Sequence, residues 1–215
     1  MIRSDLAVHY INHMGDDRTV VNSARVSYNK QIQTLADKDR SLLVYLARNK
    51  HFSPFEHCVL SVLIECPLYI RSQIHRHRTF SYNEISRRYT SDNITYYLPP
   101  LDREQDTINK QSSIVIDSTM TIETMRLIVE SAIQTYNRLI DTGVAREVAR
   151  SVLPQCIMTK FYMTGNLRNW HSFIELRMSH RAQYECQIIA EKIHAILLAY
   201  FPKSYEALHE ARQIR

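Results

Sequence analysis

The chain has 215 residues, of which 45% are hydrophobic and 23% are charged, with 27 Lys and Arg against 22 Asp and Glu. This is the composition of a globular protein with room for one sizeable core, and it excludes disordered and collagen-like chains. No stretch approaches the roughly 18 uninterrupted apolar residues of a membrane helix, and the opening residues MIRSDLAVHY lack the apolar core of a secretory signal. We therefore expect a soluble, cytoplasmic protein.

The four cysteines are widely spaced and form no CxxC pair. Such spacing is typical neither of a zinc knuckle nor of a dense disulfide framework. We expect reduced thiols at all four positions. They are Cys58, Cys66, Cys156 and Cys186.

The first half of the chain predicts a helix, a strand and a second helix. Residues 37–50 place apolar side chains on one helical stripe, with Asp37 as the expected N-cap. Residues 57–66 are rich in Val, Leu and Ile and stop at Pro67, which indicates a largely buried strand. Pro67 suits the first turn of a helix that would carry the arginines that follow it.

Residues 96–113 are polar and proline-marked, which favours a loop. Residues 121–141 repeat apolar side chains at intervals of three and four, which predicts an amphipathic helix that ends at Gly143. This is the clearest helical pattern in the chain.

The last third predicts a short helix over residues 145–152, a strand over residues 155–166 and a last long helix over residues 182–200. Helices dominate, and the few strands do not alternate regularly with them. The predicted fold class is therefore α+β rather than doubly wound α/β.

The densest group of functional side chains lies in residues 71–90, which contain five arginines and two histidines but only one acid, Glu84. Arginine offers a planar fork of donors that suits phosphate and carboxylate groups. If the predicted helix continued through residues 71–78, Arg71, His75 and Arg78 would share one face. We expect a compact anionic ligand here.

Three other interpretations of the basic run remain open. It could be a solvated surface, or a nucleic-acid site in which bases stack on the interleaved aromatic rings. The near-balanced charge of the rest of the chain favours a compact anion over a long polyanion. A metal site built from His51, His57, His75 and His77 is disfavoured, because adjacent arginines would oppose a bound dication.

The run Arg76-His77-Arg78, followed by seven residues and Ser86, resembles the RHRx7S signature of the flavin-dependent thymidylate synthases. The longer form RHRTFSYNEISRRY matches the family pattern at about ten specified positions. Further blocks follow in the family's order and span nearly the whole chain. They are SARVS at 23–27, HFSPFEH at 51–57, ARSVLP at 149–154, NLR at 166–168 and LR at 176–177.

The resemblance implies reductive methylation of dUMP to dTMP, with methylenetetrahydrofolate as carbon donor, FAD as redox cofactor and NADPH as reductant. It implies one domain over residues 1–215, with long helices packed on a small, mostly antiparallel sheet. It also implies a homotetramer with shared active sites, no nucleic-acid or membrane partner, no metal and no cysteine nucleophile. A degenerate homologue that binds the nucleotide without catalysis is a third possibility, which nothing in the sequence favours.

Site residues follow from the same resemblance. Arg177 matches the arginine placed against the uracil ring, where its charge would favour the N3-ionised form, and it is the catalytic candidate. Ser86 and Arg88 match positions near the phosphate, and Ser86 lacks an adjacent base that would make it a nucleophile. The full set of expected dUMP contacts is Gln73, Ile74, His75, Arg76, Glu84, Ile85, Ser86, Arg87, Arg88, Arg150 and Arg177.

A second set matches the family's flavin contacts, and His51 matches a histidine near the flavin and the folate. Ser53 stands where many members have threonine, which keeps the hydroxyl. Ser172 stands where an asparagine is common, which shortens the side chain and removes an amide. The expected FAD contacts are Ser53, Arg76, His77, Arg78, Glu84, Asn166, Leu167, Arg168 and Ser172.

Cys156 follows Leu153-Pro154-Gln155, a run superficially similar to the cysteine loop of the cysteine-dependent thymidylate synthases. A nucleophilic thiol needs a base or cation nearby to form the thiolate. We expect Cys156 to be a small buried thiol on a strand instead.

Overall fold

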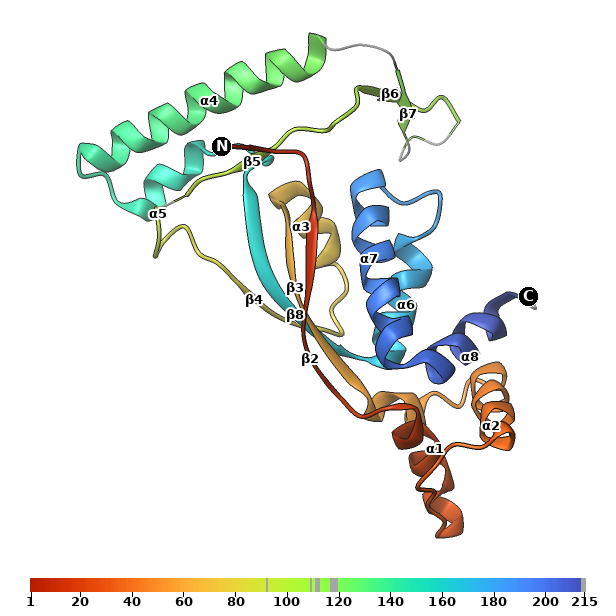
Figure 1. Cartoon of the computed structure of the whole chain (residues 1–215). Helices are drawn as coiled ribbons and strands as arrows, with labels where there is room; N and C mark the ends of the chain where they lie inside the picture. Colours follow the sequence, from red (N-terminus) through yellow and green to blue (C-terminus); the bar gives the residue numbers. More distant parts are fainter. Residues whose placement is uncertain (92, 109, 111–112, 117–119, 214–215) are drawn as a thin grey trace.

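A computed structural model describes residues 1–91, 93–108, 110, 113–116 and 120–213 of the chain. Its centre is a four-stranded antiparallel sheet in the order β2-β3-β8-β4 (Figure 1). The strands are β2 (Ala7–Met14), β3 (Val59–Pro67), β8 (Met158–Asn166) and β4 (Ser81–Glu84). The two inner strands confirm the strands predicted at 57–66 and 155–166, each with its start shifted by two or three residues.

Helices outnumber strands in residues, which confirms the α+β class. Figure 1 shows α6 and α7 side by side next to the sheet, with α8 and α2 packed together beyond them. Large apolar side chains such as Trp170, Phe173 and Phe161 are fully buried in this main core. The helices are α1 (Asp17–Arg25), α2 (Asp37–Arg48), α3 (Leu68–Ile74), α4 (Met120–Asp141), α5 (Arg146–Ala149), α6 (Leu167–Arg177), α7 (Tyr184–Tyr200) and α8 (Pro202–Gln213), with 3₁₀ helices at Val26–Tyr28, Ser53–His57 and Arg150–Val152.

The helix predicted after Pro67 is shorter than expected. Pro67 is the last residue of β3, and α3 ends at Ile74. The prediction of one helical face that carries Arg71, His75 and Arg78 is therefore wrong, because Arg78 lies beyond the helix. At Arg78 the backbone has already turned toward β4. The Tyr82 hydroxyl stabilises that turn by donating to the carbonyls of Ile74 and His77, at 3.1 and 2.8 Å.

The other helix predictions differ in detail. Asp37 is the first residue of α2 rather than its N-cap, and the Asp39 carboxylate accepts from the backbone N–H of Ala36, the residue before the helix. The helix predicted at 182–200 is confirmed as α7, but it is not the last, since α8 follows after Phe201. Residues 145–152 form α5 and a 3₁₀ turn, close to the prediction.

The stretch at 96–113 is not a simple loop. β5 (Tyr96–Tyr97) pairs in parallel with β1 (Ile2–Arg3), and β6 (Arg103–Gln105) pairs antiparallel with β7 (Ser113–Val115). Alternating-hydrophobicity signals are too weak in strands of two or three residues to predict them.

The predicted helix at 121–141 is confirmed as α4, and Gly143 with a φ of +85° ends it in the left-handed region that glycine adopts freely. α4 lies across the end of the molecule next to α5, away from α8 (Figure 1). It buries Val129 and Tyr136, while Ile128 on the predicted apolar stripe stays 63% exposed. A second, smaller apolar cluster forms beneath it.

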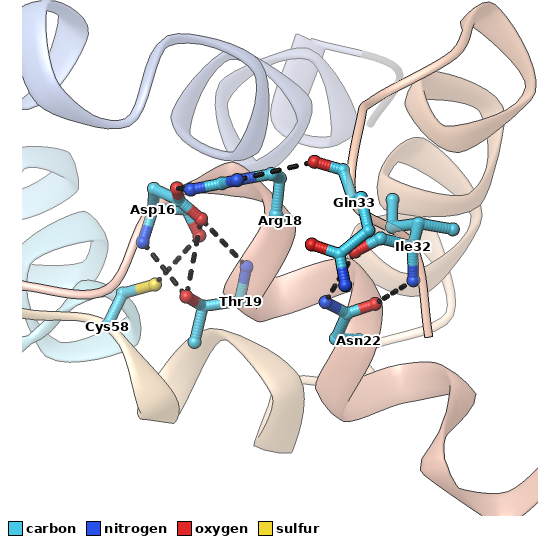
Figure 2. Close-up of polar contacts among 7 residues, drawn as sticks. All are labelled: Asp16, Arg18, Thr19, Asn22, Ile32, Gln33 and Cys58. Atoms are coloured by element: carbon cyan, nitrogen blue, oxygen red, sulfur yellow. Dashed lines mark hydrogen bonds and ion pairs between the residues drawn. The ribbon is translucent and has the colours of Figure 1, made fainter. Parts of the chain in front are cut away.

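Side-chain contacts fix the start of α1 and the segment that follows it (Figure 2). Asp16 caps α1 by accepting from the Thr19 N–H at 3.0 Å, and the Arg18 guanidinium folds back onto the Asp16 carboxylate. The Asn22 amide donates to the carbonyl of Ile32 at 3.1 Å and accepts from its N–H at 2.8 Å. The Asn22 contacts hold the segment between α1 and α2, which also contains the 3₁₀ helix at Val26–Tyr28.

All four cysteines are buried and unpaired, as expected. Burial raises the pKa of the Cys58 thiol to about 12 and that of the Cys186 thiol to about 11. Of the helices in the described ranges, none combines the length and the apolar composition that a membrane crossing requires.

Candidate functional site

The basic run contributes to a cavity of about 360 Å³ between α3, the end of β4 and the start of β8, here called the arginine cavity. Five of its lining residues are among those expected from the sequence, and three of its lining side chains are arginines. The lining residues are Leu68, Arg71, Glu84, Ile85, Ser86, Arg87, Arg150, Leu153, Ile157, Met158 and Thr159.

Glu84 is the single acid in the lining of the arginine cavity, and two side chains fix its carboxylate. The Thr159 hydroxyl donates to Glu84 Oε1 at 2.7 Å, and Arg71 Nε lies 3.2 Å from the same oxygen. Sequence reasoning placed Arg71 in the basic run but assigned it no role, and it missed Thr159. Both contacts are made to Oε1, so Glu84 Oε2 can meet a ligand donor.

The turn after β4 brings short polar groups next to the arginines. Ser86 Oγ accepts from the Arg88 N–H at 3.2 Å, and the carbonyl of Ser86 accepts from the Tyr89 N–H at 3.0 Å. The Arg88 side chain points elsewhere, since it is 53% exposed and pairs with Glu147 at 3.7 Å. Arg88 is thus near the arginine cavity in sequence but is not part of its lining.

Arg177 ends α6 and is held from two sides. Its Nε donates to His77 Nε2 at 2.9 Å, and its second terminal nitrogen donates to the carbonyl of Gln73 at 2.8 Å. The predicted catalytic arginine and two residues of the basic run therefore lie together, although about a hundred positions separate them in sequence.

His77 is a neutral imidazole in this arrangement. Burial, helped by the Arg177 charge, lowers the pKa of His77 to about 4. Its Nε2 accepts from Arg177, so its proton is on Nδ1. Phe173 contacts the ring edge-on with centroids 4.8 Å apart, which fixes the orientation of the ring.

The remaining residues of the basic run point in different directions. Arg76 and Arg78 are exposed, and Ile74 is fully buried in the core. The His75 ring packs on Tyr82 with centroids 4.2 Å apart, and burial lowers the pKa of His75. Among the described residues, no three His, Cys, Asp or Glu side chains group in a way that could hold a metal ion.

A second cavity of about 330 Å³, here called the α6 cavity, lies between α2, α6 and α8. The expected residues Arg168 and Ser172 line it, and the Arg168 guanidinium lies 5.3 Å from the centroid of the Phe52 ring. Arg168 also pairs with Glu56. The lining residues are Ala47, Arg48, Lys50, Phe52, Arg168, His171, Ser172, Glu175, Leu208 and Ala211.

Four more expected residues lie beside the α6 cavity without lining it. His51 and Ser53 flank Phe52 in the chain, and His51 is exposed. Asn166 caps α6 by accepting from the Asn169 N–H at 2.9 Å. The Leu167 side chain is buried, and its N–H donates to the carbonyl of Cys58 at 2.8 Å.

The two cavities share no lining residue, so the expected flavin set is split. Arg168 and Ser172 line one cavity, and Glu84 lines the other. Sequence reasoning missed Arg48 and Lys50, which bring two further cations to the α6 cavity. Their only sequence signal is their position just before the HFSPFEH block.

Cys156 lies in the turn before β8 rather than on the strand, packed in the smaller apolar cluster. Burial raises the pKa of its thiol. Within the described residues, no hydrogen bond or ion pair joins the Cys156 thiol to a base or a cation. The geometry is that of a small apolar side chain.

Sequence comparisons identify a family that spans most of the chain. The family model described as thymidylate synthase complementing protein (Thy1) matches residues 9–203. The chain is 40% identical over 204 residues to a flavin-dependent thymidylate synthase of Kosmotoga olearia, covering 93% of this chain and 88% of that one. It is also 40% identical over 200 residues to one of Thermotoga neapolitana, covering 93% and 89%.

A solved structure supports the same grouping. The UMP/dUMP methylase PolB of Streptomyces cacaoi, crystallised with 5-Br dUMP, matches with a TM-score of 0.88 at 31% identity. The match covers 97% of each chain. The fold is therefore shared over nearly the full length, including the elements that form both cavities.

Proposed function

The chain belongs to the family of flavin-dependent thymidylate synthases, and we propose that it is a single-domain methyltransferase that converts dUMP to dTMP. The observation that carries this proposal is the arginine cavity, in which Arg71, Arg87 and Arg150 line the same space as the Glu84 carboxylate, and Arg71 contacts it. Arginines around a cavity of about 360 Å³ suit a compact phosphorylated ligand. The UMP/dUMP methylase with the same fold binds a nucleotide of this kind.

The arginine cavity would hold dUMP through positively charged arginines and the negatively charged Glu84 carboxylate. Ser86, Arg87 and Arg150 would bind the phosphate, because all three line the cavity and offer a hydroxyl and two guanidinium groups. The fixed Glu84 carboxylate would accept from the sugar or the base, since an ionised carboxylate is an acceptor only. The other expected contacts, Gln73, Arg76 and Arg88, do not line the cavity, and Arg88 would have to leave Glu147 to reach the ligand, beside the backbone at Ile74, His75 and Ile85.

Arg177 would face the uracil ring, where its positive charge favours the N3-ionised form of the base. The neutral His77 takes one of its donors and the Gln73 carbonyl takes another. The guanidinium retains further N–H donors for the substrate. We therefore regard Arg177 as the catalytic residue, positioned before the substrate arrives.

The α6 cavity fits part of FAD. Arg48, Lys50 and Arg168 bring three cations to a cavity that also contains the Phe52 ring, as a pyrophosphate and an aromatic group require. When bound, FAD supplies the redox chemistry, with NADPH as reductant and methylenetetrahydrofolate as carbon donor. Ser53, Asn166, Leu167 and Ser172 would also contact it, and His51 would lie near the flavin and the folate.

A homotetramer with shared sites would explain why the expected flavin set is split. Arg76 and Arg78 are exposed, and they could reach a flavin held in the α6 cavity of another subunit. The apolar side chains of Leu127 and Ile128 on α4 are 57% and 63% exposed, as expected of a face that another subunit covers. Mixing Arg168→Ala and Arg177→Ala proteins, each inactive alone, should restore activity if one site uses both chains.

The chemistry would need no enzyme cysteine, because the Cys156 thiol is buried and its pKa is raised. The test is to purify the protein, record its visible spectrum, and measure tritium release from C5-labelled dUMP. We expect flavin bands that bleach with NADPH under anaerobic conditions and tritium release that requires dUMP, folate and flavin. A protein that stays colourless with FAD and binds oligonucleotides in a salt-sensitive way would overturn the proposal.

Arg177→Ala should sharply reduce dTMP formation while the flavin stays bound. The control is Arg18→Ala, which removes an exposed arginine that pairs with Asp16 at the start of α1 and lines neither cavity. Equal loss of activity in both variants would argue against the role of Arg177.

A further inference from the structure

A chain of hydrogen bonds runs from the β6 strand to Gln73. Arg103 donates through both terminal nitrogens to the Glu185 carboxylate, one of them to Oε2 at 3.4 Å. Gln183 Nε2 donates to the same Oε2 at 3.1 Å, and Gln183 Oε1 accepts from Gln73 Nε2. Gln73 Oε1 then accepts from the Cys186 thiol at 3.3 Å. We call these residues the Gln73 relay.

The Arg103–Glu185 ion pair at the start of α7 is deeply buried. The Glu185 side chain is fully buried, and that of Arg103 is 15% exposed. The Arg103 guanidinium also lies over the Tyr184 ring, 5.3 Å from its centroid. Without Arg103, an ionised carboxylate at this depth would lack a counter-ion, which proteins rarely tolerate. Arg103 is therefore the counter-ion of the Glu185 carboxylate.

A charged carboxylate fixes the direction of every bond beyond it. Because Glu185 can only accept, Gln183 must turn its NH₂ group toward Glu185 and its carbonyl oxygen toward Gln73. Gln73 must then turn its own NH₂ group toward Gln183, which leaves its oxygen facing the thiol. The Cys186 thiol keeps its proton, since burial raises its pKa to about 11, and it can donate to that oxygen. The charge at Glu185 thus dictates which end of the Gln73 amide faces which way.

Gln73 is also the residue whose backbone carbonyl holds Arg177. Gln73 therefore has two roles: its side-chain amide is proposed to bind the substrate, and its backbone carbonyl holds the proposed catalytic arginine. The relay acts on the side chain alone, because its bonds end at Nε2 and Oε1.

We propose that Arg103, Glu185 and Gln183 are positioning residues that set the orientation of the Gln73 amide for dUMP. The proposal gives the β6–β7 excursion a role in substrate binding, although it contributes no residue to either cavity. It rests on the proposed function, since Gln73 is assigned to dUMP there.

The decisive variant is Glu185→Gln, which keeps the shape of the side chain and removes its charge. Arg103 can only donate, so the new amide turns its oxygen to Arg103 and its NH₂ group to Gln183. That inverts Gln183 and then Gln73. We expect the KM for dUMP to rise about tenfold, while kcat stays within about twofold because the backbone contact to Arg177 is untouched.

The double variant Glu185→Gln/Gln183→Glu moves the carboxylate from position 185 to position 183 and leaves the net charge and the side-chain volume unchanged. An acceptor at position 183 again forces the Gln73 NH₂ group to face it, so the KM should recover most of its tenfold rise. A purely structural role for Glu185 predicts no such recovery. Arg103→Lys, which keeps the charge, should raise the KM less than Arg103→Met.

The matched control is Arg25→Met, which breaks another partly buried ion pair, with Asp39, between α1 and α2. Its melting temperature should fall while its KM for dUMP stays unchanged. An unchanged KM in Glu185→Gln, or a raised KM that the double variant does not recover, would overturn the relay. Failure of the proposed function would instead show as wild-type protein that neither binds nor methylates dUMP.

Discussion

The neutral state of His77 should make the stability of the fold depend on pH. The pKa of His77 is lowered from 6.5 to about 4 in the folded chain, so only the unfolded chain takes up this proton as the pH falls below 6.5. The contribution is therefore complete above pH 6.5 and is lost as the pH falls toward 4. Between pH 7 and pH 5 a shift of this size amounts to about 2 kcal/mol, which we halve to about 1 kcal/mol because the ring is only half-buried.

The assay compares urea unfolding of the wild type and of His77→Gln at pH 7 and pH 5. Glutamine offers an oxygen that can accept from Arg177 but does not titrate. A loss of about 1 kcal/mol lowers the urea midpoint by about 0.5 M when the free energy of unfolding falls by about 2 kcal/mol per M urea. Only the wild type should show this additional fall in the midpoint between pH 7 and pH 5. Other buried histidines, such as His75 and His194, contribute equally to both proteins. Equal pH dependence in the two proteins would refute the neutral His77.

Three further changes test the site and the core. Cys156→Ser should form dTMP at a rate within about twofold of the wild type in a steady-state assay, because a buried, protonated thiol is not a nucleophile. A near-complete loss of activity would show that Cys156 is the nucleophile. Thr159→Val removes the donor to Glu84 and should raise the KM for dUMP by roughly three- to tenfold, with Ser at the same position restoring it. Gly165→Ala would place a methyl group 2.4 Å from the Phe80 ring, and thermal unfolding should show a loss of about 1–3 kcal/mol.

The elements that the sequence predicted well are those whose signal is local. The stripe in residues 121–141 repeats over several turns, and α4 follows it almost to the residue. β3 was predicted because its run of branched apolar residues ends at a proline. α6 was not predicted as an element, because its buried face is built from Trp170, His171 and Phe173 and its apolar periodicity is short.

The site was only partly predictable for a different reason. Glu84 and Ser86 are neighbours in the motif, so their placement in one cavity follows from the sequence. Thr159 reaches Glu84 only because β4 pairs with β8, with Glu84 opposite Phe161, and no local pattern encodes that register. Arg103 and Glu185 are 82 residues apart, and their meeting depends on the packing of the excursion against α7.

α6 links the two proposed ligand sites within one chain. Arg168 in its first turn lines the α6 cavity, and Arg177 in its last turn contacts His77. Nine residues at a rise of 1.5 Å separate the two α-carbons by about 13 Å along the axis. Trp170 anchors the helix between them by donating from its indole N–H to the carbonyl of Leu60 on the central strand at 3.1 Å. Because a helix does not stretch, α6 fixes the spacing of the two arginines, and this contact helps to place both of them against the sheet. A change in α6 packing should therefore disturb flavin and nucleotide binding together, whereas a change in the Gln73 relay should affect the nucleotide alone.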